Sequence, residues 1–217
     1  REIASNIVPL LDETAEAVDL SKATTAIFYS ISNTQTGLKG ISFGDSLIKR
    51  VVETLKADFP QLKTFATLSP IPGFRAWYRK NAARLLEELP DKHRRTLGRY
   101  IGFEPVTVEH IQTWLDQGPH PDAKCPGARW MLHCASRYLG HELEQGRPID
   151  PVARFHLGNG ARVEHIHWLA DPSAKGMQQS WGLMVNYLYD LKKLDRHRKM
   201  LREGKIPVSG EVSDLSL

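Results

Sequence analysis

The sequence predicts an α/β fold, because segments with the composition of strands alternate with segments of helical periodicity. Residues 24–32, 62–68 and 161–169 are rich in β-branched and aromatic side chains or alternate between apolar and polar positions. Residues 45–59 and 74–89 follow two of these segments and carry apolar side chains at helical spacing. A chain of 217 residues suits one large domain or one and a half.

Composition narrows the class of protein. Hydrophobic residues make up 41% and charged residues 25% of the chain, as in ordinary soluble proteins. The net charge of +4 suits an anionic ligand but is not concentrated into a stripe for nucleic acid. No apolar run approaches the ~20 residues of a membrane span, and we recognise no signal peptide. Cys125 and Cys134 do not make a disulfide framework, so we expect a reducing, cytoplasmic setting.

The N-terminal part begins with a short amphipathic helix at residues 2–12 and a loop at 14–23, followed by the strand at 24–32. A glycine-containing loop at residues 33–44 then leads into the helix at 45–59, which Asp45 or Ser46 can cap. Strand, glycine loop and helix form a geometry that binds phosphate, because backbone N–H groups at a helix start attract anions. The glycine spacing matches neither the P-loop nor the Gly-x-Gly-x-x-Gly motif. The alternative that this is an ordinary loop without a phosphate therefore stays open.

Ser69 lies at a stiff junction between the strand at 62–68 and the helix at 74–89. Pro70 biases Ser69 toward extended geometry, and Pro72 with Gly73 turns the chain into the helix. Such a serine can donate a hydrogen bond to an anion near the helix start. Considered alone, a serine before proline is in most cases only a turn or cap residue.

Residues 90–146 are mostly helical and have the character of an insertion. Residues 107–115 and 129–143 have helical periodicity, and the proline- and glycine-containing runs at 118–122 and 125–127 break it. We expect the histidines in this region to be surface or core residues.

The stretch 150–161 places His156 on a short helix. Asp150 followed by Pro151 is a helix-start signal, and the run at 158–160 (Gly-Asn-Gly) ends the helix. A hairpin with a strand at 152–157 is the alternative. In the strand that follows, His165 and His167 can point the same way, but a catalytic zinc site normally needs three protein ligands, so we predict no metal.

The C-terminal part reads as a long helix from residue 173 to about 203, and a break in it stays open because Gly176 and Gly182 weaken it locally. Asn186 and Tyr189 would then share a helix face. Residues 204–217 read as a loose tail, and the final Leu-Ser-Leu departs from the peroxisomal address.

Four stretches resemble the catalytic domain of the malonyl-CoA decarboxylase family, and the resemblance extends over about residues 25–191. They are 28–40 (Phe-Tyr-Ser-Ile-Ser-Asn-Thr-Gln-Thr-Gly-Leu-Lys-Gly), 69–74 (Ser-Pro-Ile-Pro-Gly-Phe), 150–161 (Asp-Pro-Val-Ala-Arg-Phe-His-Leu-Gly-Asn-Gly-Ala) and 182–189 (Gly-Leu-Met-Val-Asn-Tyr-Leu-Tyr). The resemblance implies a GNAT-like acyl-CoA N-acyltransferase fold with a mixed central sheet flanked by helices. It also implies a helical insertion at about 90–147, and a preceding helical domain that this chain lacks.

The resemblance further implies an enzyme, a carboxy-lyase that converts malonyl-CoA to acetyl-CoA and carbon dioxide. His156 would be the proton donor and Ser69 would stabilise the carboxylate or the enolate. No cofactor is needed, since the thioester accepts the charge. Malonyl-CoA is the expected partner, without nucleic acid or membrane, and a homo-oligomer is expected.

Substrate-binding residues are also implied by the resemblance. The pyrophosphate loop of the GNAT fold, usually Gln/Arg-x-x-Gly-x-Gly/Ala, would correspond to residues 37–42, which depart from it at the first and last positions. The resemblance also places the segment at 173–203 beside the active site. We therefore expect contacts to substrate from Gln35, Gly37, Gly40, Ser42, Gly44, Asn186 and Tyr189.

Two other functions stay open at this stage. An acyltransferase on the same fold would use His156 as the base for an incoming amine, and it would turn over only when an acceptor is added. A non-catalytic module would bind CoA and turn nothing over. A serine hydrolase is disfavoured, because no Gly-x-Ser-x-Gly elbow surrounds Ser69.

Overall fold

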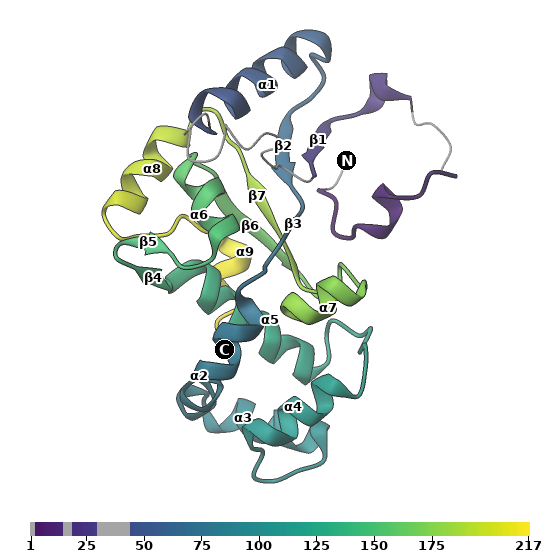
Figure 1. Ribbon diagram of the computed structural model, residues 1–217, viewed down its shortest axis with the longest axis vertical. Helices are drawn as coiled ribbons and strands as arrows, with labels where there is room; N and C mark the ends of the chain where they lie inside the picture. The colour runs from purple at the N-terminus through teal and green to yellow at the C-terminus, as the bar shows by residue number, and fades with distance from the viewer. Residues whose placement is uncertain (1–2, 15–18, 30–43) are drawn as a thin grey trace.

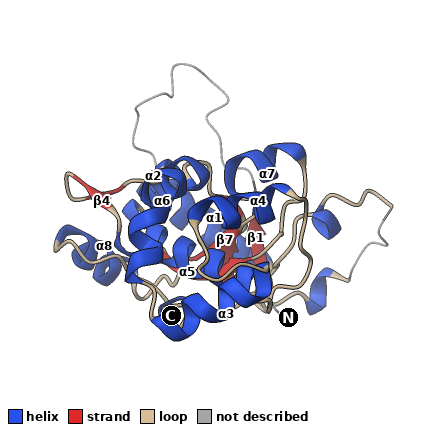
Figure 2. Ribbon diagram, turned by 90° about the horizontal axis from the view of Figure 1, so that it is seen from below, coloured by secondary structure: helices blue, strands red, loops and turns tan. Residues whose placement is uncertain are grey.

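The computed structural model describes residues 3–14, 19–29 and 44–217 (Figure 1). Helices lie on both sides of a central sheet, and Figure 2 shows strands β1 and β7 in the interior between them. The predicted α/β class with a mixed sheet flanked by helices is therefore confirmed.

The main sheet has β7 near its centre. β1 is parallel to β2, whereas β2, β3 and β6 all pair with β7 in the antiparallel sense, so the sheet is mixed. A β-bulge interrupts the pairing of β6 with β7 between Val163 and His165. The strands are β1 (Thr25–Phe28), β2 (Thr64–Thr67), β3 (Ser69–Pro70), β6 (Arg162–His167) and β7 (Met184–Leu188), with β4 (Leu143–Glu144) and β5 (Arg147–Pro148) forming a separate pair.

The helices include the predicted ones at 45–59, 74–89 and 107–115. Figure 1 shows α2, α3 and α4 together below the sheet and α1 above it. Their bounds are α1 (Gly44–Asp58), α2 (Phe74–Glu88), α3 (Asp91–Ile101), α4 (Val108–Asp116), α5 (Pro126–His141), α6 (Pro151–Gly158), α7 (Ala174–Ser180), α8 (Leu194–Arg202) and α9 (Gly210–Ser213), with short 3₁₀ turns at Val8–Leu10 and Leu20–Lys22.

An aromatic cluster connects α2 to α5 and to the chain entering β7. Phe74 packs against Tyr78, Tyr138 and Trp181 with ring centroids 5.8–6.2 Å apart. The buried indole of Trp130 donates a hydrogen bond of 3.0 Å to the Tyr78 hydroxyl. Burying several large rings stabilises this junction strongly, since each ring removes 150–250 Å² from water in typical cases. The start of α2 is thereby fixed relative to α5 and β7.

The prediction of a long helix over residues 173–203 is wrong. Residues 174–180 form α7, which ends at Trp181 and Gly182 with φ angles of 51° and 77°. The chain then enters the strand β7, whose residues are nearly all buried. A fully buried strand lacks the alternation that distinguishes a strand from a helix in sequence.

Both ends of the chain also differ from the sequence prediction. The helix predicted at 2–12 is reduced to the turn at Val8–Leu10, because Pro9 has no N–H to donate within a helix. The tail at 204–217 is not loose: Val208 bridges to Val163 of β6, and α9 packs on the same strand with Val212 buried.

The structure also differs from the predicted helix break at residues 125–127 and decides between the helix and the hairpin that the sequence allows around His156. The run at 125–127 does not break a helix but starts one, since Pro126 is the first residue of α5 and Cys125 is its N-cap. Residues 151–158 form a helix, so the hairpin alternative for this stretch is wrong.

Candidate active site

Ser69 lies in β3, immediately after β2, where Pro70 holds the backbone extended. Its side chain is 5% exposed, and its hydroxyl donates to Thr67 Oγ1 at 2.9 Å. The same Thr67 oxygen accepts the backbone N–H of Tyr187 at 3.2 Å. Thr67 therefore holds the Ser69 hydroxyl against strand β7.

His156 lies on the second turn of α6. Asp150 caps this helix and Pro151 opens it, as the sequence predicts. The imidazole is 4% exposed, whereas Phe155 beside it is 40% exposed. The ring of Tyr187 stacks on the imidazole with centroids 4.6 Å apart and planes inclined by 23°. The imidazole is therefore clamped in one orientation.

The structure brings Ser69 and His156 together, although they are 87 residues apart in sequence. His156 Nε2 lies 3.4 Å from Ser69 Oγ. The other ring nitrogen, Nδ1, lies 2.7 Å from the hydroxyl of Tyr189. The hydroxyl of Tyr189, the imidazole of His156, the hydroxyl of Ser69 and that of Thr67 thus form one continuous row of hydrogen-bonding groups.

Burial decides the charge state of this row. It lowers the pKa of His156 to about 3, so the imidazole is neutral near pH 7. Burial also raises the pKa of Tyr189, which keeps the phenol protonated. A neutral imidazole has one donor and one acceptor nitrogen. Because Ser69 donates to Thr67, the consistent arrangement has Tyr189 donating to Nδ1 and the Nε2–H facing Ser69.

Asn186 and Tyr189 do not share a face, contrary to the sequence prediction. They lie an odd number of residues apart along an extended chain, so their side chains point to opposite sides of the sheet. The Asn186 amide is 0% exposed and donates to the carbonyl oxygens of Thr67 and Ala4. Its Oδ1 lies 2.5 Å from Nε2 of His167. Asn186 therefore connects strands and the N-terminal segment.

The predicted phosphate loop lies mostly outside the described residues. Gln35, Gly37, Gly40 and Ser42 all fall in this part, while Gly44 is the first residue of α1. The assignment of this loop to substrate stays a prediction.

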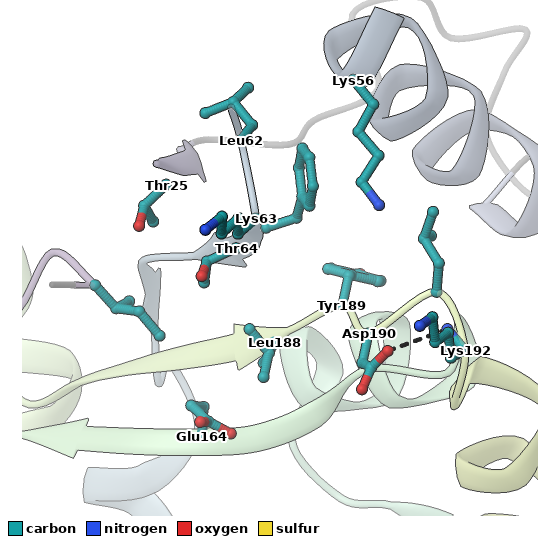
Figure 3. A pocket seen from close by; sticks show the side chains of 13 residues that line it. Thr25, Lys56, Leu62, Lys63, Thr64, Glu164, Leu188, Tyr189, Asp190 and Lys192 are labelled. Atoms are coloured by element: carbon teal, nitrogen blue, oxygen red, sulfur yellow. Dashed lines mark hydrogen bonds between the residues drawn. The ribbon is translucent and has the colours of Figure 1, made fainter. Parts of the chain in front are cut away.

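A pocket of about 590 Å³ opens beside Tyr189 (Figure 3). Lys56, Lys63 and Lys192 are among its lining residues, and Figure 3 shows Lys56 reaching down from α1 toward the pocket. Two acidic groups in the lining, Glu164 and Asp190, are each paired with a basic side chain, namely Arg162 and Lys193. The pocket thus has a positive balance, and Tyr189 is the lining residue that contacts His156.

The remaining histidines of β6 do not add a metal site. His165 and His167 lie on one side, as expected, with ring centroids 5.9 Å apart, and His165 pairs with Glu211 at 2.8 Å. Across residues 3–14, 19–29 and 44–217, no three His, Cys, Asp or Glu side chains gather closely enough to hold a metal ion. Among the same residues, no helix has both the length and the apolar character to cross a membrane.

Sequence reasoning missed Thr67 and Tyr187 as parts of the site. Tyr187 and Tyr189 are two residues apart, so on a strand both face His156. That spacing was the available signal, but it was hidden by the helical interpretation of this segment. Thr67 gave no signal, since the contact that ties it to the site, with the backbone N–H of Tyr187, joins segments 120 residues apart.

Comparison with known proteins places the chain in a family. The sequence profile "Malonyl-CoA decarboxylase C-terminal domain" matches residues 1–216. The mitochondrial malonyl-CoA decarboxylases of Anser anser anser and Mus musculus are 36% and 37% identical to it over 208 residues, in matches that cover 88% of this chain. The chain spans only 40% and 41% of those two proteins.

Solved structures support the same family assignment. The crystal structure of malonyl-CoA decarboxylase from Cupriavidus metallidurans is 42% identical with a TM-score of 0.82 and covers 99% of this chain. That of the Agrobacterium vitis protein is 43% identical with a TM-score of 0.81 and covers 100%. This chain spans 52% and 51% of those two chains, respectively. The mixed sheet flanked by helices is thus the GNAT-like fold predicted from the sequence, and the chain belongs to the malonyl-CoA decarboxylase family.

Proposed function

We propose that the protein containing this chain converts malonyl-CoA to acetyl-CoA and carbon dioxide. The observation that carries the proposal is the buried contact of 3.4 Å between Ser69 Oγ and His156 Nε2, with Tyr189 on the far side of the imidazole. The matched relatives are named as malonyl-CoA decarboxylases, and this chain corresponds to about half of their length or less.

Ser69 serves the first step, in which the bond between the carboxylate and the methylene carbon breaks. The electron pair of that bond moves into the thioester and leaves an enolate oxygen, while carbon dioxide departs. A hydroxyl that donates a hydrogen bond to the developing charge lowers the barrier. The Ser69 oxygen is held in place beside Thr67 and Pro70, and its one proton turns from Thr67 Oγ1 to the enolate oxygen. We assign Ser69 to this electrostatic role and not to a covalent one.

His156 serves the second step, in which the enolate carbon takes a proton. With a pKa of about 3, His156 carries no imidazolium proton to give at neutral pH. Its neutral Nε2–H is the donor, while the Tyr189 hydroxyl keeps its proton and stabilises the resulting imidazolate through the hydrogen bond to Nδ1. An enolate carbon is basic enough to accept a proton from a neutral N–H, and solvent then returns a proton to Nε2. This role differs from titration near neutral pH, the usual reason for choosing histidine.

The substrate is polyanionic, which fits the positive balance of the pocket beside Tyr189. We assign its phosphates to the segment that precedes α1, as the family resemblance implies, with Gln35, Gly37, Gly40, Ser42 and Gly44. The expectations that no metal or organic cofactor is needed, that the protein forms homo-oligomers and that it works in the cytoplasm stay predictions.

The test is to incubate the full-length protein with malonyl-CoA and to measure acetyl-CoA and carbon dioxide. We expect turnover without any added acceptor. His156→Ala should lower kcat by about two to four orders of magnitude, the usual span for a general acid, and Ser69→Ala by about two to three orders. Ser180→Ala is the matched control, since Ser180 is a buried, hydrogen-bonded serine outside the site.

Two outcomes would overturn the proposal. One is acetyl-CoA formation that requires an amine acceptor, which would identify an acyltransferase. The other is near-normal turnover in a folded His156→Ala protein. A malonyl or acetyl adduct on the peptide containing Ser69, formed as fast as turnover, would replace the electrostatic role of Ser69 with a nucleophilic one.

A further inference from the structure

Asp150 is an almost fully buried carboxylate, 1% exposed, that serves two helices at once. Its Oδ1 accepts the backbone N–H groups of Val152 and Ala153 at 2.9 and 3.0 Å. These bonds make Asp150 the N-cap of α6, the helix that carries His156.

The second oxygen of the same carboxylate points to a different part of the chain. Asp150 Oδ2 accepts the backbone N–H of Gly73 at 3.4 Å and the hydroxyl of Tyr138 at 3.2 Å. Gly73 is the N-cap of α2 and lies four residues after Ser69. One carboxylate therefore joins the helix that carries His156 to the turn that follows Ser69.

The contact of the residue 73 backbone with Asp150 and Tyr138 requires a glycine. Gly73 has an ordinary helical φ of −87°, so conformational freedom does not explain it. A Cβ atom at this position would lie 2.2 Å from the Tyr138 hydroxyl and 3.5 Å from Asp150 Oδ2. The absence of a side chain is what allows the backbone of the Ser69 turn to approach the Asp150 carboxylate and Tyr138.

We propose that Asp150 is a positioning residue that sets the separation between Ser69 and His156. The proposal rests on the decarboxylase function proposed above. The two side chains come from segments 87 residues apart, and the turn at residues 70–73 together with the first turns of α6 fixes their relative positions. A shift of about 1 Å between reacting groups typically costs about 10²-fold in rate. Asp150 touches neither reacting group and acts through the two backbones.

The variants Asp150→Asn and Asp150→Ser distinguish the positioning role of Asp150 from its role as the N-cap of α6. Both are good N-caps for α6. Neither places an acceptor toward Gly73 and Tyr138 while it caps α6, because asparagine then offers an amide N–H₂ there and serine offers nothing. We expect Asp150→Asn and Asp150→Ser to lower kcat about 10- to 100-fold in the full-length protein. KM for malonyl-CoA should change by less than about twofold, because binding groups are untouched.

Thr107→Ala is the matched control, since Thr107 is the side-chain N-cap of α4, away from Ser69 and His156. It removes the side-chain cap bond of α4, from the N–H of His110 to the Thr107 hydroxyl, and should keep the wild-type kcat. Tyr138→Phe is the milder variant for the case in which both Asp150 variants fail to fold. It removes one of the two bonds to Oδ2 and should lower kcat by about three- to tenfold.

A second readout does not depend on activity. The imidazole ¹⁵N and ¹H signals of His156 report whether Nε2 contacts Ser69. We expect Asp150→Asn and Tyr138→Phe to shift these signals, while Thr107→Ala leaves them unchanged. The positioning role is excluded if the folded Asp150→Asn and Tyr138→Phe proteins keep both the wild-type kcat and the wild-type His156 signals. Wild-type protein without decarboxylase activity would refute the proposed function, and the imidazole signals would still decide whether Asp150 sets this contact.

Discussion

His156 shows what burial does to a single side chain. Its ring lies under Tyr187 and against Tyr189, and it has almost no contact with solvent. Water no longer stabilises the imidazolium there, and this loss lowers the pKa to about 3. A residue that is often chosen as a switch near neutral pH is here kept in one charge state.

This charge state gives a pH dependence of stability. The unfolded chain binds a proton on His156 below pH ~6.5, whereas the folded protein does not until about pH 3. The contribution of neutral His156 to stability is therefore complete above pH ~6.5 and is lost as the pH falls. Between pH 7 and pH 5, wild type should lose about 2 kcal/mol more than His156→Asn.

Urea unfolding at both pH values measures this difference. The raised pKa of Asp150, which burial causes, acts on wild type and variant alike and cancels in the comparison. Equal losses in the two proteins would contradict a depressed pKa of His156.

Asn186 shows a polar side chain whose hydrogen bonds are all made inside the protein. Its amide connects β7 to Thr67 of β2 and to the N-terminal segment at Ala4. Asn186→Ala should lower the free energy of unfolding by about 2–3 kcal/mol, because the buried carbonyl of Thr67 and the partly buried carbonyl of Ala4 lose this donor. Asn81→Ala is the control, since the side chain of Asn81 makes only local bonds within α2, donating to the carbonyl of Trp77 and accepting from Arg84, and it should cost less than half as much.

Urea unfolding and kinetics together decide the role of Asn186. The sequence-based assignment to substrate binding predicts a higher KM with unchanged stability. A structural role predicts the reverse.

At the scale of elements, the C-terminal segment, residues 204–217, is attached to strand β6. Ser209 donates to the carbonyl of Glu164 at 2.6 Å and accepts the N–H of Val212 at 3.1 Å, so it both attaches the segment and caps α9. Ser209→Ala should cost about 1–2 kcal/mol, the usual value for losing a cap together with a partly buried hydrogen bond.

Ser213→Ala is the matched control for Ser209→Ala. Its exposed hydroxyl makes one bond within α9, and its loss should cost less than about 0.5 kcal/mol. Thermal or urea unfolding of both variants checks the comparison. Similar effects would mean that the segment contributes little through Ser209.

Local signals made some elements predictable. Asp150 and Pro151 start α6, and Gly158 to Gly160 end it, so the position of His156 on a short helix followed from neighbouring residues. The conformations of β7 and of the C-terminal segment were not predictable in this way. Their conformations depend on partners in β2, β3 and β6, and a buried strand has no polar face to reveal it.

At the scale of the whole molecule, the fold class followed from composition and order, but the site did not. Nothing in the spacing of Ser69 and His156 brings them together, and the family resemblance supplied the pair. The sheet explains why: Ser69 follows β2, His156 precedes β6, and β7 lies between the two. Tertiary pairing of this kind is decided by long-range contacts that single-sequence patterns do not contain.

The position of β7 also sets the order in which the molecule can form. Every strand that pairs with β7 precedes it in the chain, so during synthesis the joining of β2, β3 and β6 into one sheet waits for residues 184–188. Helices α2 to α5 depend largely on nearby sequence and can form before that moment. The partner of His156 Nδ1 is Tyr189, which follows β7 directly. The candidate active site is therefore among the last parts of this chain to assemble, and a nascent chain that stops short of β7 lacks the strand that brings Ser69 and His156 together.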